Sequence, residues 1–171
     1  MMIRLWLAFA LIALPAKGVA AAEWWQTGPA LPALTGRVVD EAALLSPPQE
    51  AALTRALAAY EARTRHQFVV VTVKSLHGQA IERFGIRLGR TWGIGRRAID
   101  DGVLLIVAPN ERKVRVEVGY GLERQISDPE SARIIRDVIV PAFGKGDMAG
   151  GIARGADAIM ALPERPAPPR R

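Results

Sequence analysis

Two apolar segments separated by an amphipathic one constrain the fold of this chain most. QFVVVTV, residues 67–73, and VLLIVA, residues 103–108, are nearly free of polar side chains, as expected of strands covered on both faces of a sheet. Between them, residues 79–92 have the spacing of an amphipathic helix. Its apolar face carries Ile81, Phe84, Leu88 and Trp92. This order predicts a right-handed crossover between two parallel strands.

The segments on either side extend this unit. Ser46-Pro47-Pro48-Gln49 supplies an N-cap Ser, a Pro at the first helical position and a capping-box Gln, so a helix should begin there. After a turn at residues 109–112, KVRVEV (113–118) alternates apolar and charged residues and predicts a hairpin partner. Together these elements predict an α/β fold, a three-layer α/β/α sandwich with a mixed central sheet.

Two more helices are expected near the C-terminus. Asp128-Pro129 should cap a third helix, which is expected to end near Pro141. Asp147 should cap a fourth, with Ile152 and Ile159 on its apolar face. Both would cover the sheet.

The N-terminus has the pattern of a secretory signal peptide. Arg4 precedes a short apolar run that ends at Pro15, and small residues follow up to Ala22. These features are typical of a signal that is cleaved after Ala22, whereas a membrane span needs about 20 apolar residues. We expect an exported protein, periplasmic or extracellular, with no transmembrane helix in the mature chain.

The chain therefore divides into four parts. They are a signal peptide over 1–22, a Pro- and Gly-rich linker over 23–36, the α/β/α domain over 37–162 and a disordered basic tail over 163–171. No cysteine is present, so an ordinary core must stabilise the exported domain. The net charge is +6, but the basic residues are scattered with few aromatics between them. Nucleic acid is therefore an unexpected partner, whereas a phosphorylated ligand is compatible with the charge.

Acidic residues precede the second apolar strand in IDDG, residues 99–102. If residues 109–112 close the hairpin, GYGLE (119–123) lies beside IDDG. Asp100, Asp101 and Glu123 then share one edge of the sheet with glycines that leave the backbone open.

This edge has two readings. Several oxygen donors around an open turn suit a hard cation such as Ca²⁺. Alternatively, Asp100 and Asp101 form a solvated turn and make ion pairs with Arg96 or Arg97. His66 and His77 lack the spacing of a zinc site, and no nucleophile elbow, Walker A loop or dinucleotide motif is present. Catalytic residues therefore stay unassigned.

Several motifs resemble those of the TPM domain family: VVDEAALLS, WGIG, DDGVLLIVAPNERKVRVEVGYGLE and PAFGKGDMAGGI. The family includes exported bacterial proteins and thylakoid-lumen proteins linked to photosystem II repair. The resemblance implies an α/β/α sandwich, binding of Ca²⁺ or Mg²⁺ and, in some members, acid phosphatase activity. It places the metal-proximal acids at Asp40, Asp100, Asp101, Glu123 and Asp147.

Two functions are consistent with these observations. The first, which we favour, is a metal-stabilised accessory module that supports assembly or repair of membrane protein complexes. The second is a divalent-metal-dependent acid phosphatase acting on phosphomonoesters. In that enzyme Asp100 and Asp101 would hold the metal, and Arg96 or Arg97 would bind the phosphate. The first is favoured because fold and metal do not establish chemistry and no nucleophile is evident.

Overall fold

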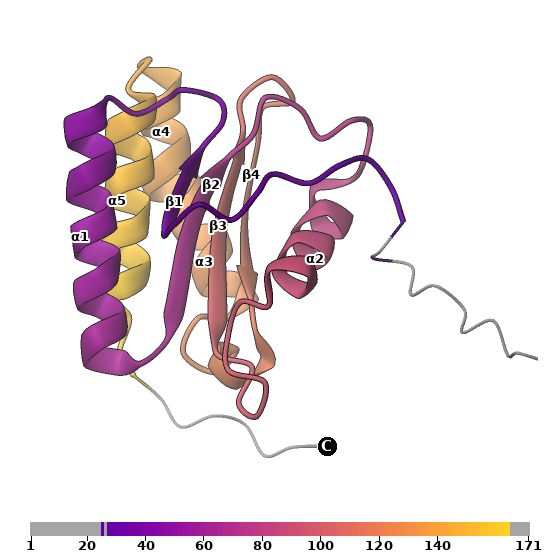
Figure 1. Ribbon diagram of the computed structural model, residues 1–171. Helices are drawn as coiled ribbons and strands as arrows, with labels where there is room; N and C mark the ends of the chain where they lie inside the picture. The colour runs from indigo at the N-terminus through magenta and orange to yellow at the C-terminus, as the bar shows by residue number, and fades with distance from the viewer. Residues whose placement is uncertain (1–24, 26, 165–171) are drawn as a thin grey trace, which may run out of the picture.

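The structure is a computed structural model that describes residue 25 and residues 27–164 (Figure 1). The signal peptide expected over 1–22 and the tail beyond residue 164 lie outside the described residues. Within the described part, no helix has both the length and the hydropathy that crossing a membrane requires.

The described residues contain a mixed sheet in which the strands lie in chain order. Its strands are β1 (Val38–Asp40), β2 (Gln67–Thr72), β3 (Gly102–Ala108) and β4 (Lys113–Val118). The first three are parallel, and β4 is antiparallel to β3. Ala108 pairs with Lys113 and Val103 with Val118, which confirms the hairpin register predicted from the turn.

Helices cover both faces of this sheet (Figure 1). One face packs against α1 (Pro47–Thr64), α3 (Asp128–Ile134) and α5 (Met148–Met160), and the other against α2 (Ile81–Trp92). The predicted three-layer α/β/α sandwich is confirmed. The helices α1 and α2 lie on opposite faces of the sheet, and each connection moves one strand further in the same direction. The β1–α1–β2 and β2–α2–β3 crossovers therefore have opposite hands.

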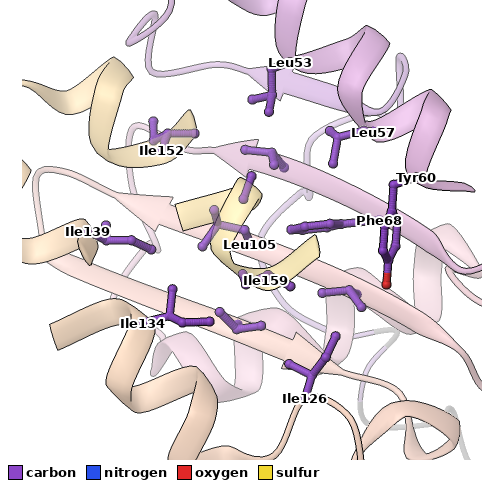
Figure 2. Close-up of a cluster of buried hydrophobic side chains, with 14 of the residues drawn as sticks. Leu53, Leu57, Tyr60, Phe68, Leu105, Ile126, Ile134, Ile139, Ile152 and Ile159 are labelled. Carbon is purple, nitrogen blue, oxygen red and sulfur yellow. The ribbon is translucent and has the colours of Figure 1, made fainter. Parts of the chain in front are cut away.

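Apolar side chains fill the layer between the sheet, α1 and α5 (Figure 2). Leu57, Phe68 and Leu105 are completely or almost completely buried there. Alternate residues of the same strands, such as Leu104 and Ile106, point to the other face and pack under α2. Burial of each such side chain contributes roughly 1.5–3 kcal/mol to the stability of the fold. The strands, and therefore the positions of their ends, are firmly held by this packing.

Local signals account for the helix starts, with one correction. The Gln49 side chain accepts a hydrogen bond from the Ser46 backbone N–H at 2.9 Å, as the capping box predicted. For α3 the predicted cap was wrong, because Ser127 rather than Asp128 is the N-cap and accepts from the Glu130 N–H. Asp147 caps α5 as predicted.

The expected end of the third helix near Pro141 was also wrong. The chain passes from α3 through a π-helical segment, η3 (Ile135–Ile139), into α4 (Val140–Gly144). Pro141 has no N–H to donate to the preceding turn, and a wider π turn relieves that mismatch. The helical path therefore continues past the proline.

Residues 27–36, expected to be a linker, lie along α2, and we call them the strap. The side chain of Arg87 on α2 is almost fully buried and donates to the Pro29 carbonyl at 3.0 Å. Trp92 Nε1 donates to the Pro32 carbonyl at 2.9 Å. The strap is thus held to α2 by hydrogen bonds from the side chains of Arg87 and Trp92.

Candidate functional site

A pocket of about 560 Å³ lies where α2, the 93–101 loop and β4 meet, and we call it the α2 groove. It is at the amino end of β3, the edge that carries IDDG. The backbone of Gly85 and Gly89 lines its α2 side, and Glu117 and Val118 line its β4 side. The sequence analysis did not identify this pocket. Gly85 and Gly89, spaced by four along α2, were the available signal, because they mark a side of the helix that approaches the sheet closely.

Gly95 brings the loop against the strand. Gly95 has a φ of 95°, and a Cβ there would stand 2.6 Å from the Gly102 backbone nitrogen. Only glycine combines this conformation with this close approach. The loop therefore closes one end of the α2 groove with its own backbone.

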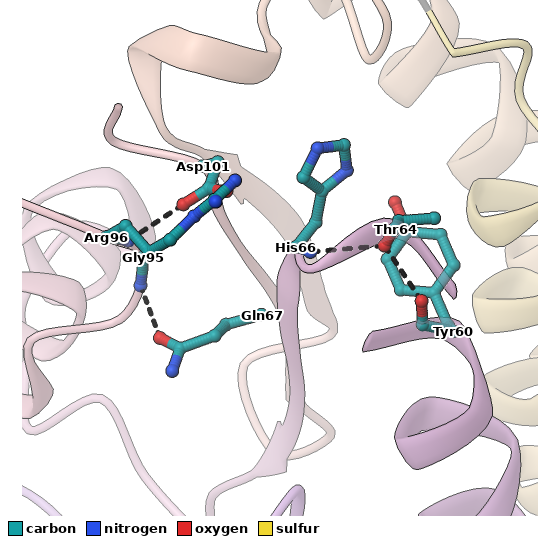
Figure 3. A network of polar contacts seen from close by, with 7 residues as sticks. All are labelled: Tyr60, Thr64, His66, Gln67, Gly95, Arg96 and Asp101. Atoms are coloured by element: carbon teal, nitrogen blue, oxygen red, sulfur yellow. Dashed lines mark hydrogen bonds and ion pairs between the residues drawn. The ribbon is translucent and has the colours of Figure 1, made fainter. Parts of the chain in front are cut away.

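A buried Asp101 and a partly exposed Arg96 form an ion pair at this end (Figure 3). The Asp101 side chain is 0% exposed and accepts from the Arg96 backbone N–H at 2.8 Å and from Arg96 Nε at 2.8 Å. Burial alone would raise the pKa of Asp101, but the hydrogen bonds from Arg96 outweigh it and hold the pKa below its ordinary value. For Asp101, the predicted ion pair with Arg96 is present, but the expectation of a solvated turn was wrong at this residue, because its side chain is completely buried.

Asp100 differs from its neighbour because it is exposed and lines the α2 groove. Its φ of 56° is left-handed, a conformation that Asp tolerates better than most residues. Its carboxylate accepts from the Tyr120 N–H at 3.2 Å, and its carbonyl accepts from the Gly121 N–H at 2.8 Å. IDDG and GYGLE are thus adjacent, as the register predicted.

Glu123 follows a short 3-10 helix, η2 (Tyr120–Leu122), and its side chain is exposed. It belongs to the GYGLE segment but does not line the α2 groove. The structure therefore brings only Asp100, of the predicted metal-proximal acids, into the pocket.

Asp40 lies at the end of the sheet where the parallel strands terminate, whereas Asp100 lies at the end where β3 begins. Asp40 is the last residue of β1 and pairs with Thr72, which in turn pairs with Val107 near the carboxyl end of β3. Its carboxylate accepts from the Leu45 N–H at 2.8 Å and from the Thr72 hydroxyl. These bonds close the turn after β1, so the Asp40 carboxylate has a structural role.

Asp147 is occupied by capping α5. Its carboxylate accepts from Arg154 Nη2 at 2.9 Å and from the Gly150 N–H at 2.9 Å. The bond from Arg154 and then that from Gly150 lower the pKa of Asp147. In Figure 1, α5 starts at the end of the sheet where the parallel strands terminate, opposite the end at which β3 begins.

The five predicted acids do not fit one divalent cation site. Asp101 is neutralised by Arg96, while Asp40 and Asp147 are bound at the other edge of the sheet. Among the described residues, no group of three or more Asp, Glu or His side chains is arranged to hold a metal ion. Binding of Ca²⁺ or Mg²⁺ thus stays an expectation that rests on the family resemblance.

Guanidinium groups dominate the charge of the α2 groove. Arg97 lines it, is exposed, and has no carboxylate partner within the described part of the chain. Arg90 lines it too, with its guanidinium 4.4 Å from the centre of the Trp25 ring. The Glu117 carboxylate is already bound by Arg115 Nε at 2.5 Å. The pocket therefore favours a negatively charged ligand.

Gln67 and His66 lie beside this end of the sheet (Figure 3). Gln67 accepts from the Gly95 N–H at 2.7 Å, which ties β2 to the groove loop. His66 precedes β2 as Asp101 precedes β3, and burial lowers the pKa of His66, partly offset by the Asp101 charge. Its Nδ1 is buried and has no hydrogen-bond partner among the described residues.

Comparison with protein families identifies the TPM domain. The family model described as the TPM domain matches residues 38–162, which is most of the chain. None of the curated proteins compared with the chain matches it.

Solved structures resemble the fold. The N-terminal domain of a protein from P. gingivalis has a TM-score of 0.69 and 38% identity, and the match covers 74% of this chain and 80% of that one. The N-terminal domain of the cg2496 protein from Corynebacterium glutamicum has a TM-score of 0.59 and 17% identity, over 79% of this chain and 84% of that one. The BA42 protein from Bizionia argentinensis has a TM-score of 0.59 and 20% identity, over 68% and 79%. The last two support the fold alone.

Proposed function

The chain belongs to the TPM domain family, and from that premise we propose that it is an exported accessory module that supports assembly or repair of membrane protein complexes. The observation that carries the proposal is the α2 groove. It offers guanidinium groups and open backbone to a ligand, while the buried carboxylate beside it, Asp101, is engaged by Arg96. Such a site suits recognition better than bond cleavage.

The N-terminal sequence supports the export part of the proposal. Its signal-like pattern ends at Ala22, and the strap begins a few residues later. Intact mass of the protein recovered from the periplasm should begin near Glu23. A full-length species found only in the membrane fraction would contradict export of a free domain.

Capture from membranes tests the accessory role. Tagged mature protein should recover a defined set of membrane proteins from detergent-solubilised membranes. Arg97→Glu should lose that set, because it reverses a charge in the α2 groove. Arg55→Glu should keep it, because Arg55 is exposed on α1, across the sheet. Equal recovery by all three proteins would contradict a groove-based function.

An acid phosphatase is the second candidate, favoured by the position of Arg97 beside Arg96 in the groove. Guanidinium groups bind phosphate oxygens well, so a phosphomonoester is a reasonable ligand. Purified protein should then release phosphate from a generic phosphomonoester at mildly acidic pH, and Arg97→Ala should slow that release. Activity that Arg97→Ala leaves unchanged would point to a contaminant.

A further inference from the structure

The outer edge of β4 has backbone groups that no neighbouring strand uses. The Gly119 N–H donates to the Gly102 carbonyl at 2.8 Å, so residues 119, 117, 115 and 113 point their backbone groups toward β3. The intervening Val114, Val116 and Val118 point theirs outward. Because β4 is the last strand in the sheet order of the described residues, these N–H and C=O groups face no strand there.

The α2 groove reaches β4 near the end of that strand, at Glu117, Val118 and Gly119. Val118 lines the groove at its β4 side, and Ile86 and Arg90 line it at its α2 side. A groove between a strand edge and a helix admits an extended chain, which pairs with the strand and packs its side chains against the helix.

The charges favour an acidic occupant. Arg97 has no carboxylate partner among the described residues, and the Glu117 carboxylate is paired with Arg115. Asp100 also lines the groove and keeps its negative charge, but Arg90 and Arg97 together outnumber it. A second copy of this chain would bring a second set of groove arginines to the same edge, so like charges disfavour a β4 to β4 dimer.

We propose that the α2 groove binds an extended acidic segment of a partner protein, which adds to the outer edge of β4 as a further strand. Its backbone pairs with Val116 and Val118, and its carboxylates point to the α2 side of the sheet and contact Arg97 and Arg90. The proposal rests on the accessory function above and specifies the chemistry of the partner segment.

Purified mature protein and synthetic peptides test this directly. The probe is a fluorescently labelled, end-blocked peptide of alternating Glu and Val, measured by anisotropy at fixed salt. Two control peptides replace either every Glu by Lys or alternate Val by Pro. The Lys peptide lacks the charge, and the Pro peptide keeps the charge but lacks the N–H groups needed for strand pairing. Only the Glu-Val peptide should bind.

Protein variants locate the binding. Arg97→Glu should weaken the Glu-Val peptide at least about tenfold, whereas Arg55→Glu, with the same change in net charge, should weaken it less than about twofold. In ¹⁵N spectra the amides of Val116 and Val118 should shift on titration more than those of Arg115 and Glu117. Thermal melts establish that both variants are folded.

Three results would overturn the proposal. The first is that the Pro peptide binds as tightly as the Glu-Val peptide. The second is that Arg97→Glu and Arg55→Glu weaken peptide binding equally. The third is that the protein forms a stable dimer at micromolar concentration without peptide. Peptide binding in a protein that captures no membrane proteins would remove the accessory function and leave this site standing. Capture of membrane proteins without peptide binding would remove this peptide site and leave the accessory function standing.

Discussion

The carboxylate of Asp101 is completely buried, while the Arg96 side chain that binds it is 42% exposed. The backbone N–H and the guanidinium of the same arginine both donate to this carboxylate. One aspartate at the start of β3 thus folds the preceding loop back on itself. The shape of the α2 groove depends on this pair.

Replacing Asp101 by Asn should destabilise the domain by about 2 kcal/mol. Asn keeps the shape but not the charge that Arg96 pairs with, and the expected loss lies between those of exposed and fully buried ion pairs. Urea denaturation measures it. Asp100→Asn is the matched control and should cost less than about 0.5 kcal/mol, since Asn also tolerates the left-handed conformation. Equal losses would mean that the buried pair does not organise the loop.

Gly28→Ala should release the strap from α2. Gly28 has a φ of 133°, and a Cβ there would stand 2.8 Å from the buried Arg87 guanidinium carbon. Gly78→Ala is the control, because its φ of 74° is also positive but a Cβ there would meet nothing within 4 Å. Limited proteolysis should cut residues 27–36 faster in Gly28→Ala only. Equal cleavage of both variants would contradict a clamped strap.

Stability should fall as the pH drops from about 7.5 to 5.5, because of His66. Burial lowers the pKa of folded His66, so the unfolded chain, with a histidine pKa near 6.5, binds more protons. Its contribution is therefore present above about pH 6.5 and is lost below it. Asp101 affects stability in a different, more acidic range. The pKa of Asp101 in the folded protein lies below the ordinary value near 3.9, so its contribution to stability is lost only as the pH falls through that folded-state pKa.

A variant series separates these contributions. Urea midpoints at pH 7.5 and 5.5 should differ less in His66→Gln than in wild type. His77→Gln, at an exposed histidine, should leave the difference unchanged. The charges of Asp101 and Glu164 partly offset the effect of burial on His66, and Arg96 adds to it. A midpoint difference that survives His66→Gln would assign the pH dependence to other groups.

Divalent cations should have little effect on stability. Because the predicted acids lie at two edges and most are already engaged, 5 mM Ca²⁺ or Mg²⁺ should add less than about 0.5 kcal/mol, a shift of roughly 1–2 °C in Tm. Melting in EDTA, in each cation and in salt-matched NaCl measures this. A larger shift that disappears in Asp100→Ala would show that the edge rearranges around a metal ion, as the family resemblance implies.

Much of the fold could be predicted because its signals are local. The buried runs of β2 and β3, the alternation of β4 and the Ser46 capping box each specify an element, and the four-residue turn sets the hairpin register. The helix near Pro141 was mispredicted because a π turn accommodates a proline that ordinarily ends a helix.

The candidate site was harder to predict because it depends on contacts between distant segments. Asp40 follows its strand while Asp100 precedes its own, so parallel strands place them at opposite edges, and a list of acids does not contain that information. The strap depends on Arg87, which looks like a solvated charge in the sequence but is buried against carbonyls some sixty positions away. A charged residue between Phe84 and Leu88 on an apolar helix face was the available signal.

Site-specific photo-crosslinking in intact cells tests the central claim, that the α2 groove is a binding site for a membrane-associated partner. A photoreactive amino acid replaces Ile86, which lines the groove, or Arg55 on α1. Illumination should produce discrete crosslinks to membrane proteins from position 86, reduced by an added Arg97→Glu change, and none of these from position 55. Identical crosslinks from both positions, or none from position 86 in an exported and folded protein, would contradict the account.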